Sequence, residues 1–167
     1  MNCLMMLPFF CYCYFILITF NESNSANIER GKKHDYYFSA NGNDKNDGSL
    51  DHPFKSIELF NSLKLNPGDS IFFKAGEIFE GNLILDSSKS GANEKPVVIT
   101  SYGKGNAFIN AGNGTALSIY NLSYLEINNF TCKGSGRKKG NTKSGIDISN
   151  CDNILINNIE ISGFQKS

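Results

Sequence analysis

The stretch GIDISNCDNILINNIEISG, from Gly145 to Gly163, repeats the earlier stretch ALSIYNLSYLEINNFTCKG, from Ala116 to Gly134. At an offset of 29 positions the apolar residues of the two stretches coincide, and Asn128-Asn129 aligns with Asn157-Asn158. The matched apolar pairs are Leu117 with Ile146, Ile119 with Ile148, Leu125 with Ile154, Ile127 with Ile156, Phe130 with Ile159 and Cys132 with Ile161. Self-similarity at a fixed period of this length is typical of repeat proteins.

Each copy contains three short runs in which apolar and polar residues alternate; in the second copy these are residues 146–149, 154–157 and 159–162. Such alternation predicts strands with one buried face. The links between the runs, residues 150–153 and the position around Asn158, are too short for a helical crossover. Three strands joined by tight corners predict one coil of a right-handed parallel β-helix, an all-β fold. Its coils would stack roughly 4.8 Å apart around inward Ile and Leu side chains.

Asparagine at the corners has a physical explanation in this fold. An Asn residue tolerates the left-handed backbone conformation, and its side-chain amide can hydrogen-bond to the Asn of the neighbouring coil. The alternative fold is a β-sandwich, but sandwich strands need hairpin turns that these links do not supply. The pattern therefore favours the solenoid.

Residues 1–26 predict a secretory signal peptide. Cys3 to Phe20 is apolar and aromatic almost throughout, and a segment of small and polar residues, 21–26, follows it. This order is typical of a signal peptide, and it predicts a secreted or cell-surface protein. The alternative is an uncleaved anchor, since the apolar run is barely long enough to span a membrane. Residues 27–34 form a polar lead-in, which we expect to be mobile.

The rest of the chain, residues 35–167, predicts one β-helix domain with an N-terminal cap (35–68) and roughly three coils (69–167). Apolar residues at helical spacing in residues 53–65 predict an amphipathic helix that would cover the open end of the core. The turn-rich segment 40–48 lacks the later Glu of a calcium-binding EF-hand, which favours a structured loop. Because the chain stops directly after a third strand, we expect the C-terminal part of the domain to be missing.

Composition limits the partners that we expect. The 16 Lys and Arg balance the 16 Asp and Glu, so no overall charge attracts the chain to nucleic acid or to a membrane surface. We expect a monomer, with no nucleic-acid partner and no membrane contact beyond the N-terminal segment. After cleavage only Cys132 and Cys151 would remain, and we expect two thiols rather than a disulfide or a metal site.

Four short motifs resemble one known opening; they are YFSANGND (Tyr37–Asp44), GSLDHPFKSI (Gly48–Ile57), PGDSI (Pro67–Ile71) and KAG (Lys74–Gly76). They are similar to the N-terminus of secreted bacterial right-handed β-helix proteins of the pectate lyase-like superfamily. The resemblance implies the fold and an association with carbohydrate. It does not imply one activity, because lyases, hydrolases, epimerases and non-catalytic surface proteins share this scaffold.

The resemblance also implies a substrate groove along one parallel sheet, walled by the long loop that leads to the next coil. Here that loop is GSGRKKGNTKS, from Gly134 to Ser144. The predicted substrate-binding residues are Arg137, Lys138, Lys139 and Lys143 of the loop, with Asp147 and Tyr120 on the outward face of the strands beside it. Four cations beside this face predict an acidic polysaccharide as ligand. The alternative is a solvated basic loop.

Catalysis cannot be assigned to particular residues. In the lyase members, Ca²⁺ or another cation binds the uronate carboxylate and a Lys or Arg abstracts the neighbouring proton. This chain offers neither a carboxylate cluster for calcium nor the paired carboxylates of a glycosidase. We identify no cofactor, although Ca²⁺ is expected in the full-length family. The first hypothesis is the inactive N-terminal portion of a polysaccharide lyase acting on uronate-rich glycans, and the second is a non-catalytic extracellular glycan-binding or surface protein.

Overall fold

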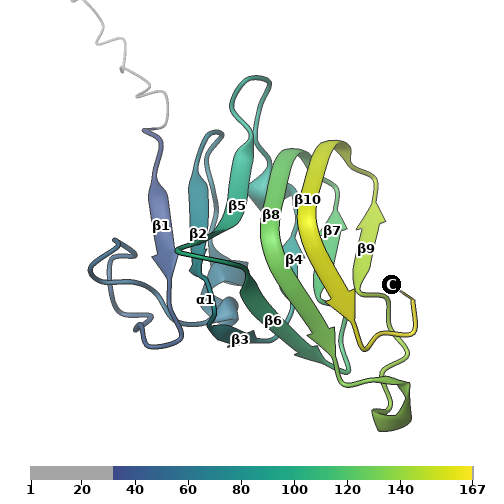
Figure 1. The fold of residues 1–167 in the computed structure, drawn as a ribbon. Helices are drawn as coiled ribbons and strands as arrows, with labels where there is room; N and C mark the ends of the chain where they lie inside the picture. Colours follow the sequence, from purple (N-terminus) through teal and green to yellow (C-terminus); the bar gives the residue numbers. More distant parts are fainter. Residues whose placement is uncertain (1–31, 167) are drawn as a thin grey trace, which may run out of the picture. The chain divides into compact units, whose positions relative to one another are not determined.

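The computed structural model describes residues 32–166 and is all-β except for one short α-helix and two 3-10 turns within that range (Figure 1). Its elements are β1 (Asp35–Phe38), α1 (Ile57–Ser62), β2 (Ser70–Lys74), β3 (Ile78–Glu80), β4 (Leu83–Leu85), η1 (Ser87–Lys89), β5 (Val97–Tyr102), β6 (Ala107–Gly112), β7 (Leu117–Tyr120), β8 (Ser123–Gly134), η2 (Arg137–Lys139), β9 (Ile146–Ser149) and β10 (Asp152–Ser162). The predicted signal peptide, residues 1–26, lies outside the described residues.

All pairings between these strands are parallel, and the strands form two sheets. In the larger sheet the first half of β8 pairs with β5 and its second half with β6, while β10 pairs with β8 along its length. The smaller sheet has the order β4-β7-β9. The chain therefore passes from β7 through both halves of β8 to β9, stacked on β7, and then to β10, stacked on β8. This winding is that of a parallel β-helix (Figure 1).

The repeat of 29 residues appears directly in the strand register. Leu117 pairs with Ile146 and Leu125 with Ile154, and every other partner of β7 with β9 and of β8 with β10 keeps the same offset. Asn158, at the predicted corner, has a φ of 51°, and its side-chain amide donates to Asn129 Oδ1 at 2.8 Å. The predicted ladder of corner amides and the predicted strand positions are therefore confirmed, but the second and third predicted strands of each copy form one continuous strand, β8 or β10.

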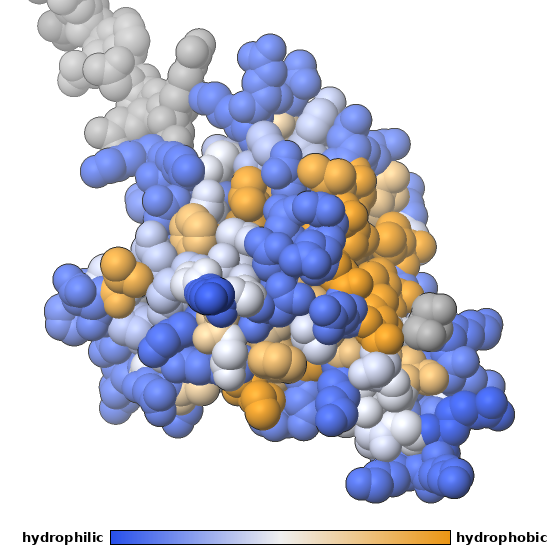
Figure 2. Space-filling model, in the orientation of Figure 1, coloured by the Kyte–Doolittle hydropathy of each residue, from blue (hydrophilic) through white to orange (hydrophobic). Residues whose placement is uncertain are grey.

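The inward residues of the coils form one continuous core. It is fully buried at Ile71, Ile99 and Ile127, which lie on three successive strands of the larger sheet. The prediction that Ile148 is also buried is wrong: 48% of this side chain is exposed, whereas its register partner Ile119 is 1% exposed. The direction of Ile148 follows the alternation, but no strand of the described residues stacks on β9 beyond it. Apolar surface accordingly gathers on the side of β9 and β10 (Figure 2).

The predicted helix over residues 53–65 is also wrong in extent, because α1 covers only Ile57–Ser62. Phe54 instead forms a parallel bridge with Phe38, and its amide donates to the Tyr37 carbonyl at 2.9 Å. The Asp44 carboxylate accepts hydrogen bonds from the backbone amides of Lys55 and Ser56, the two residues that follow Phe54. These amides are therefore bonded to a side chain and not within a helix. The helix begins only at the N-cap Ser56, whose hydroxyl accepts from the Leu59 amide at 3.0 Å.

Helix α1 contributes to the core and lies against the edge strand β4. Ile57 and Phe60 are buried in the core, and the Asn61 side chain accepts a hydrogen bond from the Ile84 amide of β4 at 2.9 Å. The buried Lys89 ammonium donates to the Asn61 carbonyl at 3.1 Å, close to the end of the helix. The helix thus occupies one hydrogen-bonding group of β4, the Ile84 amide, that a further strand could otherwise use. Its role as a cap, the right hand of the coil and the coil count stay predictions.

Candidate functional site

The loop between β8 and β9, predicted to wall a groove, is a defined structure in which η2 carries three of its four cations. Its anchor is Asn141, which is fully buried. The Asn141 amide donates to the Gly112 carbonyl at the end of β6 at 2.7 Å, and its Oδ1 accepts from the Lys143 backbone amide at 2.8 Å. The loop is therefore fastened to the solenoid at the point where it passes between the two sheets.

The four predicted cations, Arg137, Lys138, Lys139 and Lys143, are all exposed. In residues 32–166 none of them makes an ion pair; the ion pairs found there involve Lys33, His34, Lys74 and Lys89 instead. The loop therefore presents several positive charges whose field is not cancelled by an adjacent carboxylate. This arrangement attracts anions, although each exposed contact would contribute little alone.

Asp147 and Tyr120 lie where the alternation predicted, on the outward face of the β4-β7-β9 sheet. Asp147 pairs in register with Ser118 and Tyr120 pairs with Ser149, and both Asp147 and Tyr120 are exposed. Neither of them lines the hollow that lies over β6 and β8. The structure thus places the predicted acidic and aromatic residues on one face, but it does not gather them with the loop cations into a concave site.

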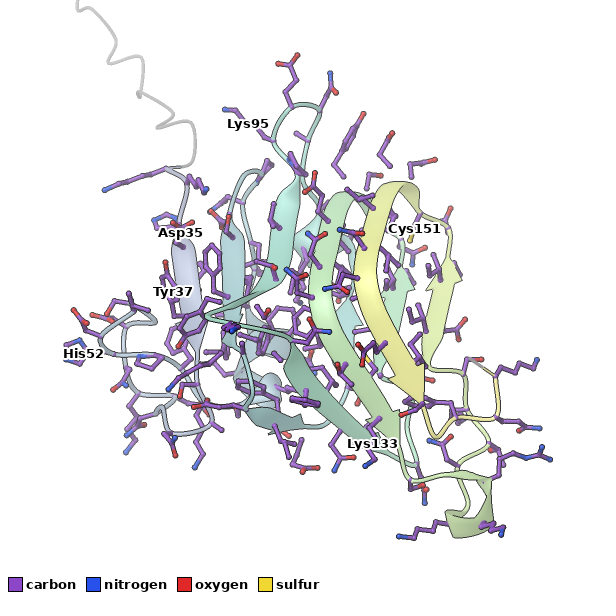
Figure 3. All side chains as sticks on the ribbon, in the orientation of Figure 1. Asp35, Tyr37, His52, Lys95, Lys133 and Cys151 are labelled. Carbon is purple, nitrogen blue, oxygen red and sulfur yellow. The ribbon has the colours of Figure 1, made fainter. Side chains whose placement is uncertain are left out.

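A hollow of about 680 Å³ lies on a different face, over β6 and the second half of β8. Lys139 is the one predicted residue that lines it, together with Lys133, Ser135 and Ser162. Lys133 projects from the lower end of β8 (Figure 3). This hollow therefore shares only the edge of the loop with the predicted site.

Two rows of outward side chains cross this face from strand to strand. By register the first row is Ile78, Phe108, Thr131 and Glu160. The second row is Glu80, Asn110, Lys133 and Ser162. Each row takes one residue from β3, β6, β8 and β10, so side chains far apart in the sequence lie about one strand spacing apart, roughly 4.8 Å.

Hydrogen bonds hold four polar members of the rows in place: Glu80, Asn110, Thr131 and Glu160. The Asn110 amide donates to the two oxygens of Glu80 at 3.1 and 2.9 Å. The Thr131 hydroxyl donates to Glu160 at 3.3 Å and accepts from the Asn106 amide at 3.3 Å. Two exposed apolar side chains, Ile78 at 58% and Phe108 at 38%, lie side by side in the first row. The face therefore combines an apolar platform with fixed donors and acceptors, as ligand sites do.

The two carboxylates of these rows are widely separated. Glu80 and Glu160 lie on strands that are three spacings apart, roughly 14 Å, which exceeds the separation of the two carboxylates in glycosidases. No group of three or more His, Cys, Asp or Glu in residues 32–166 could hold a metal ion. Within the same range, no helix is long and apolar enough to cross a membrane.

Comparison with solved structures shows where this fold occurs. It is shared with carbohydrate-active enzymes. The GH136 lacto-N-biosidase from Eubacterium ramulus superposes with a TM-score of 0.64 at 25% identity, over 80% of this chain and 28% of the enzyme. A rhamnogalacturonan lyase superposes with a TM-score of 0.51 at 19% identity, over 68% of this chain and 30% of the lyase.

The chain therefore spans less than a third of either solved protein. Both similarities support the parallel β-helix fold. No protein-family model and no curated protein matches the sequence.

Proposed function

We propose that this chain is the glycan-binding N-terminal portion of a secreted, polysaccharide-active β-helix protein, and that its ligand contains uronate. One observation carries the proposal: the anchored loop after β8 presents exposed cations, unpaired within the described residues, and one of them, Lys139, lines the hollow over β6 and β8. An acidic sugar chain satisfies both the charge and the extended shape of such a surface. The similarity to carbohydrate-active enzymes of the same fold supports this class of ligand.

The activity proposed for the whole protein is that of a polysaccharide lyase on uronate-rich glycans, with Ca²⁺ as its cofactor. The described residues contribute cations that would neutralise uronate carboxylates, but they contain no cluster of metal ligands. This portion would therefore hold the polymer without cleaving it. A rise in ultraviolet absorbance from unsaturated uronate, on incubation of this chain with polygalacturonate or alginate, would contradict that expectation.

Retention on immobilised polygalacturonate and alginate at low salt tests the binding. The test variant replaces Arg137, Lys138, Lys139 and Lys143 by Gln. The matched control has the same net charge and replaces four other exposed lysines by Gln: Lys45, Lys55, Lys64 and Lys104. We expect the wild type and the control to be retained, and the loop variant to elute early. Retention should fall within a few-fold rise in ionic strength. Equal retention of the two variants would rule out the loop.

A further inference from the structure

The outward face of β3, β6, β8 and β10 has an apolar half that the proposed function does not use. Phe108 and Ile78 are adjacent in register and expose 38% and 58% of their side chains at the hollow. Large apolar side chains that remain exposed in contact with one another often mark a binding surface. A ring such as that of Phe108 offers a flat face on which the C–H groups of a sugar can pack.

The other half of the hollow is cationic. Lys133 follows Asn110 in the second row, and Lys139 reaches the same hollow from the loop. Both side chains are exposed, and neither forms an ion pair within residues 32–166. Two ammonium groups at one end of a hollow offer charge-assisted hydrogen bonds to a carboxylate. A ligand of this hollow would thus carry an anionic group on one side of an apolar contact.

One carboxylate lies on each side of the hollow, in the direction that runs across the strands. Glu80 belongs to β3, one strand before Phe108, and Glu160 belongs to β10, one strand after Thr131. Their hydrogen bonds with Asn110 and Thr131 hold them at these borders. A carboxylate of the ligand placed over either border would meet a like charge at close range, which is unfavourable. The face therefore accepts negative charge at its centre and disfavours it on both sides.

From this pattern we propose that the hollow is a subsite for a glycan in which uronate alternates with neutral sugars. The glycan would run across the strands, with a neutral ring packed on Phe108 and the next, acidic residue at Lys133 and Lys139. Because a hexose repeats in an extended chain at about the spacing of the strands, successive sugars would meet successive strands. This proposal rests on the proposed function for the acidic class of the ligand, and it adds the pattern of charge along the ligand and the face that binds it.

The far wall of the hollow is preorganised for such contacts. Gly134, which lines it, lies so close to the Gly163 carbonyl and the Asn141 amide that an added Cβ would stand 2.4 and 2.6 Å from these atoms. The buried Asn141 also ties the loop to the end of β6. A wall that is fixed before the ligand arrives loses little conformational entropy on binding.

The test compares glycans that share uronate but differ in its spacing. Dissociation constants of the full chain are measured by titration calorimetry for oligosaccharides alternating galacturonate and rhamnose, for hyaluronan fragments, for oligogalacturonate and for neutral galactan. We expect at least one alternating glycan to bind more tightly than oligogalacturonate of equal length, with galactan weakest. Phe108→Ala and Lys133→Gln should each weaken that binding by about fivefold. Leu50→Ala and Lys104→Gln, exposed residues elsewhere, are the matched controls, and circular dichroism checks the fold of each variant.

The outcomes separate this inference from the proposed function. If oligogalacturonate binds as tightly as both alternating glycans, or if Phe108→Ala and Lys133→Gln bind like their controls, the subsite is overturned while binding of acidic glycans stands. If no acidic glycan binds, both fail. A preference for an alternating glycan that disappears in Phe108→Ala supports the subsite.

Discussion

The side-chain amide of Asn158 donates to Oδ1 of Asn129 at 2.8 Å, and the two residues occupy the same corner of successive coils. Both have positive φ, 51° for Asn158 and 64° for Asn129, in the region that Asn tolerates better than most residues. The Asn129 amide in turn donates to the Thr100 hydroxyl at 3.2 Å. A line of polar contacts thus follows this corner from one coil to the next.

This line predicts that Asn129→Ala is more destabilising than Asn129→Gly. Alanine loses the amide contacts and must also adopt a left-handed conformation, which together should cost about 2 kcal/mol. Glycine loses the contacts only and should cost roughly half as much. Urea unfolding followed by circular dichroism measures both. A glycine variant that is less stable than the alanine variant would contradict the conformational part of the argument.

The buried and exposed partners Ile119 and Ile148 give a second prediction. Ile119→Ala should reduce the free energy of unfolding by about 2–4 kcal/mol, because it opens a cavity beneath a stacked coil. Ile148→Ala should cost less than about 1.5 kcal/mol, since 48% of its side chain already meets solvent. Likewise Ile148→Asp should still fold, whereas Ile119→Asp should not. Equal losses in the two alanine variants would show that Ile148 is covered in solution.

The repeat explains why part of this fold could be predicted from the sequence. Residues 116–134 and 145–163 pair directly with each other, so their common period reveals both the strands and the corners. The first coil has no such period: Ile78 pairs with Phe108, 30 positions later, whereas Phe108 pairs with Thr131, 23 positions later. No constant offset links these residues. The sequence therefore could not predict which side chains form the two rows at the hollow.

The two wrong predictions, the length of the helix and the burial of Ile148, each have a local cause. The spacing of Phe54, Ile57 and Phe60 fits a helix, but Phe54 reaches the core from an extended backbone bridged to Phe38. Burial of an apolar residue does not reveal which backbone presents it. The exposed fraction of Ile148 depends on what stacks above it, and alternation within its own strand carries no information about that.

Low pH should weaken the contact between the N-terminal strand and the first coil, because this contact depends on the ionised carboxylate of Glu77. Burial raises the pKa of Glu77, but hydrogen bonds from the Ala40 amide and the Ser39 hydroxyl and the charge of Lys74 outweigh it. The pKa lies below its ordinary value of 4.5 as a result. A lowered folded-state pKa stabilises the fold at pH values above the unfolded-state pKa, and this contribution disappears as the pH falls through the folded-state pKa.

Glu77→Gln should therefore be less stable than the wild type at pH 7, by about 1–2 kcal/mol, and closer to it at pH 3. Chemical denaturation at the two pH values measures the difference. Glu94→Gln, at an exposed residue, is the control and should change neither value. A difference between Glu77→Gln and the wild type that is the same at both pH values would contradict the role of the ionised carboxylate.

The two described cysteines should differ in reactivity. Burial raises the pKa of the fully buried Cys132 to about 12, so almost no reactive thiolate forms at pH 8, whereas Cys151 is only half-buried. In a chain with Cys3, Cys11 and Cys13 replaced by Ser, a thiol reagent should label a single group in the folded protein and a second one only in urea. Cys151→Ser should abolish the labelling of the folded protein. Rapid modification of Cys132 without denaturant would show that the core opens there.

Loss of the loop anchor should loosen the cationic loop. Asn141 is fully buried, and its side chain joins the Gly112 carbonyl at the end of β6 to the Lys143 backbone amide. Asn141→Ala removes these two hydrogen bonds and a longer one to the Gly114 carbonyl at 3.4 Å, and it leaves the Gly112 carbonyl without this donor. We expect a loss of about 1–3 kcal/mol in local stability. Because trypsin cleaves after Arg and Lys in opened backbone, cleavage at Arg137, Lys138 and Lys139 should become faster.

The matched control for this loop is Thr142→Ala, which alters the next, exposed residue. Mass spectrometry of a tryptic time course should show early cleavage within the loop for Asn141→Ala only, before cleavage at Lys133 within β8. The same variant should be retained less strongly on acidic glycans, since cations on a mobile loop must be ordered when the ligand binds. Unchanged cleavage of Asn141→Ala would mean that η2 and its neighbouring turns hold the loop without the buried amide. In that case the cationic edge of the hollow would owe its position to backbone contacts such as the one from the Gly136 amide to the Gly163 carbonyl at 2.9 Å.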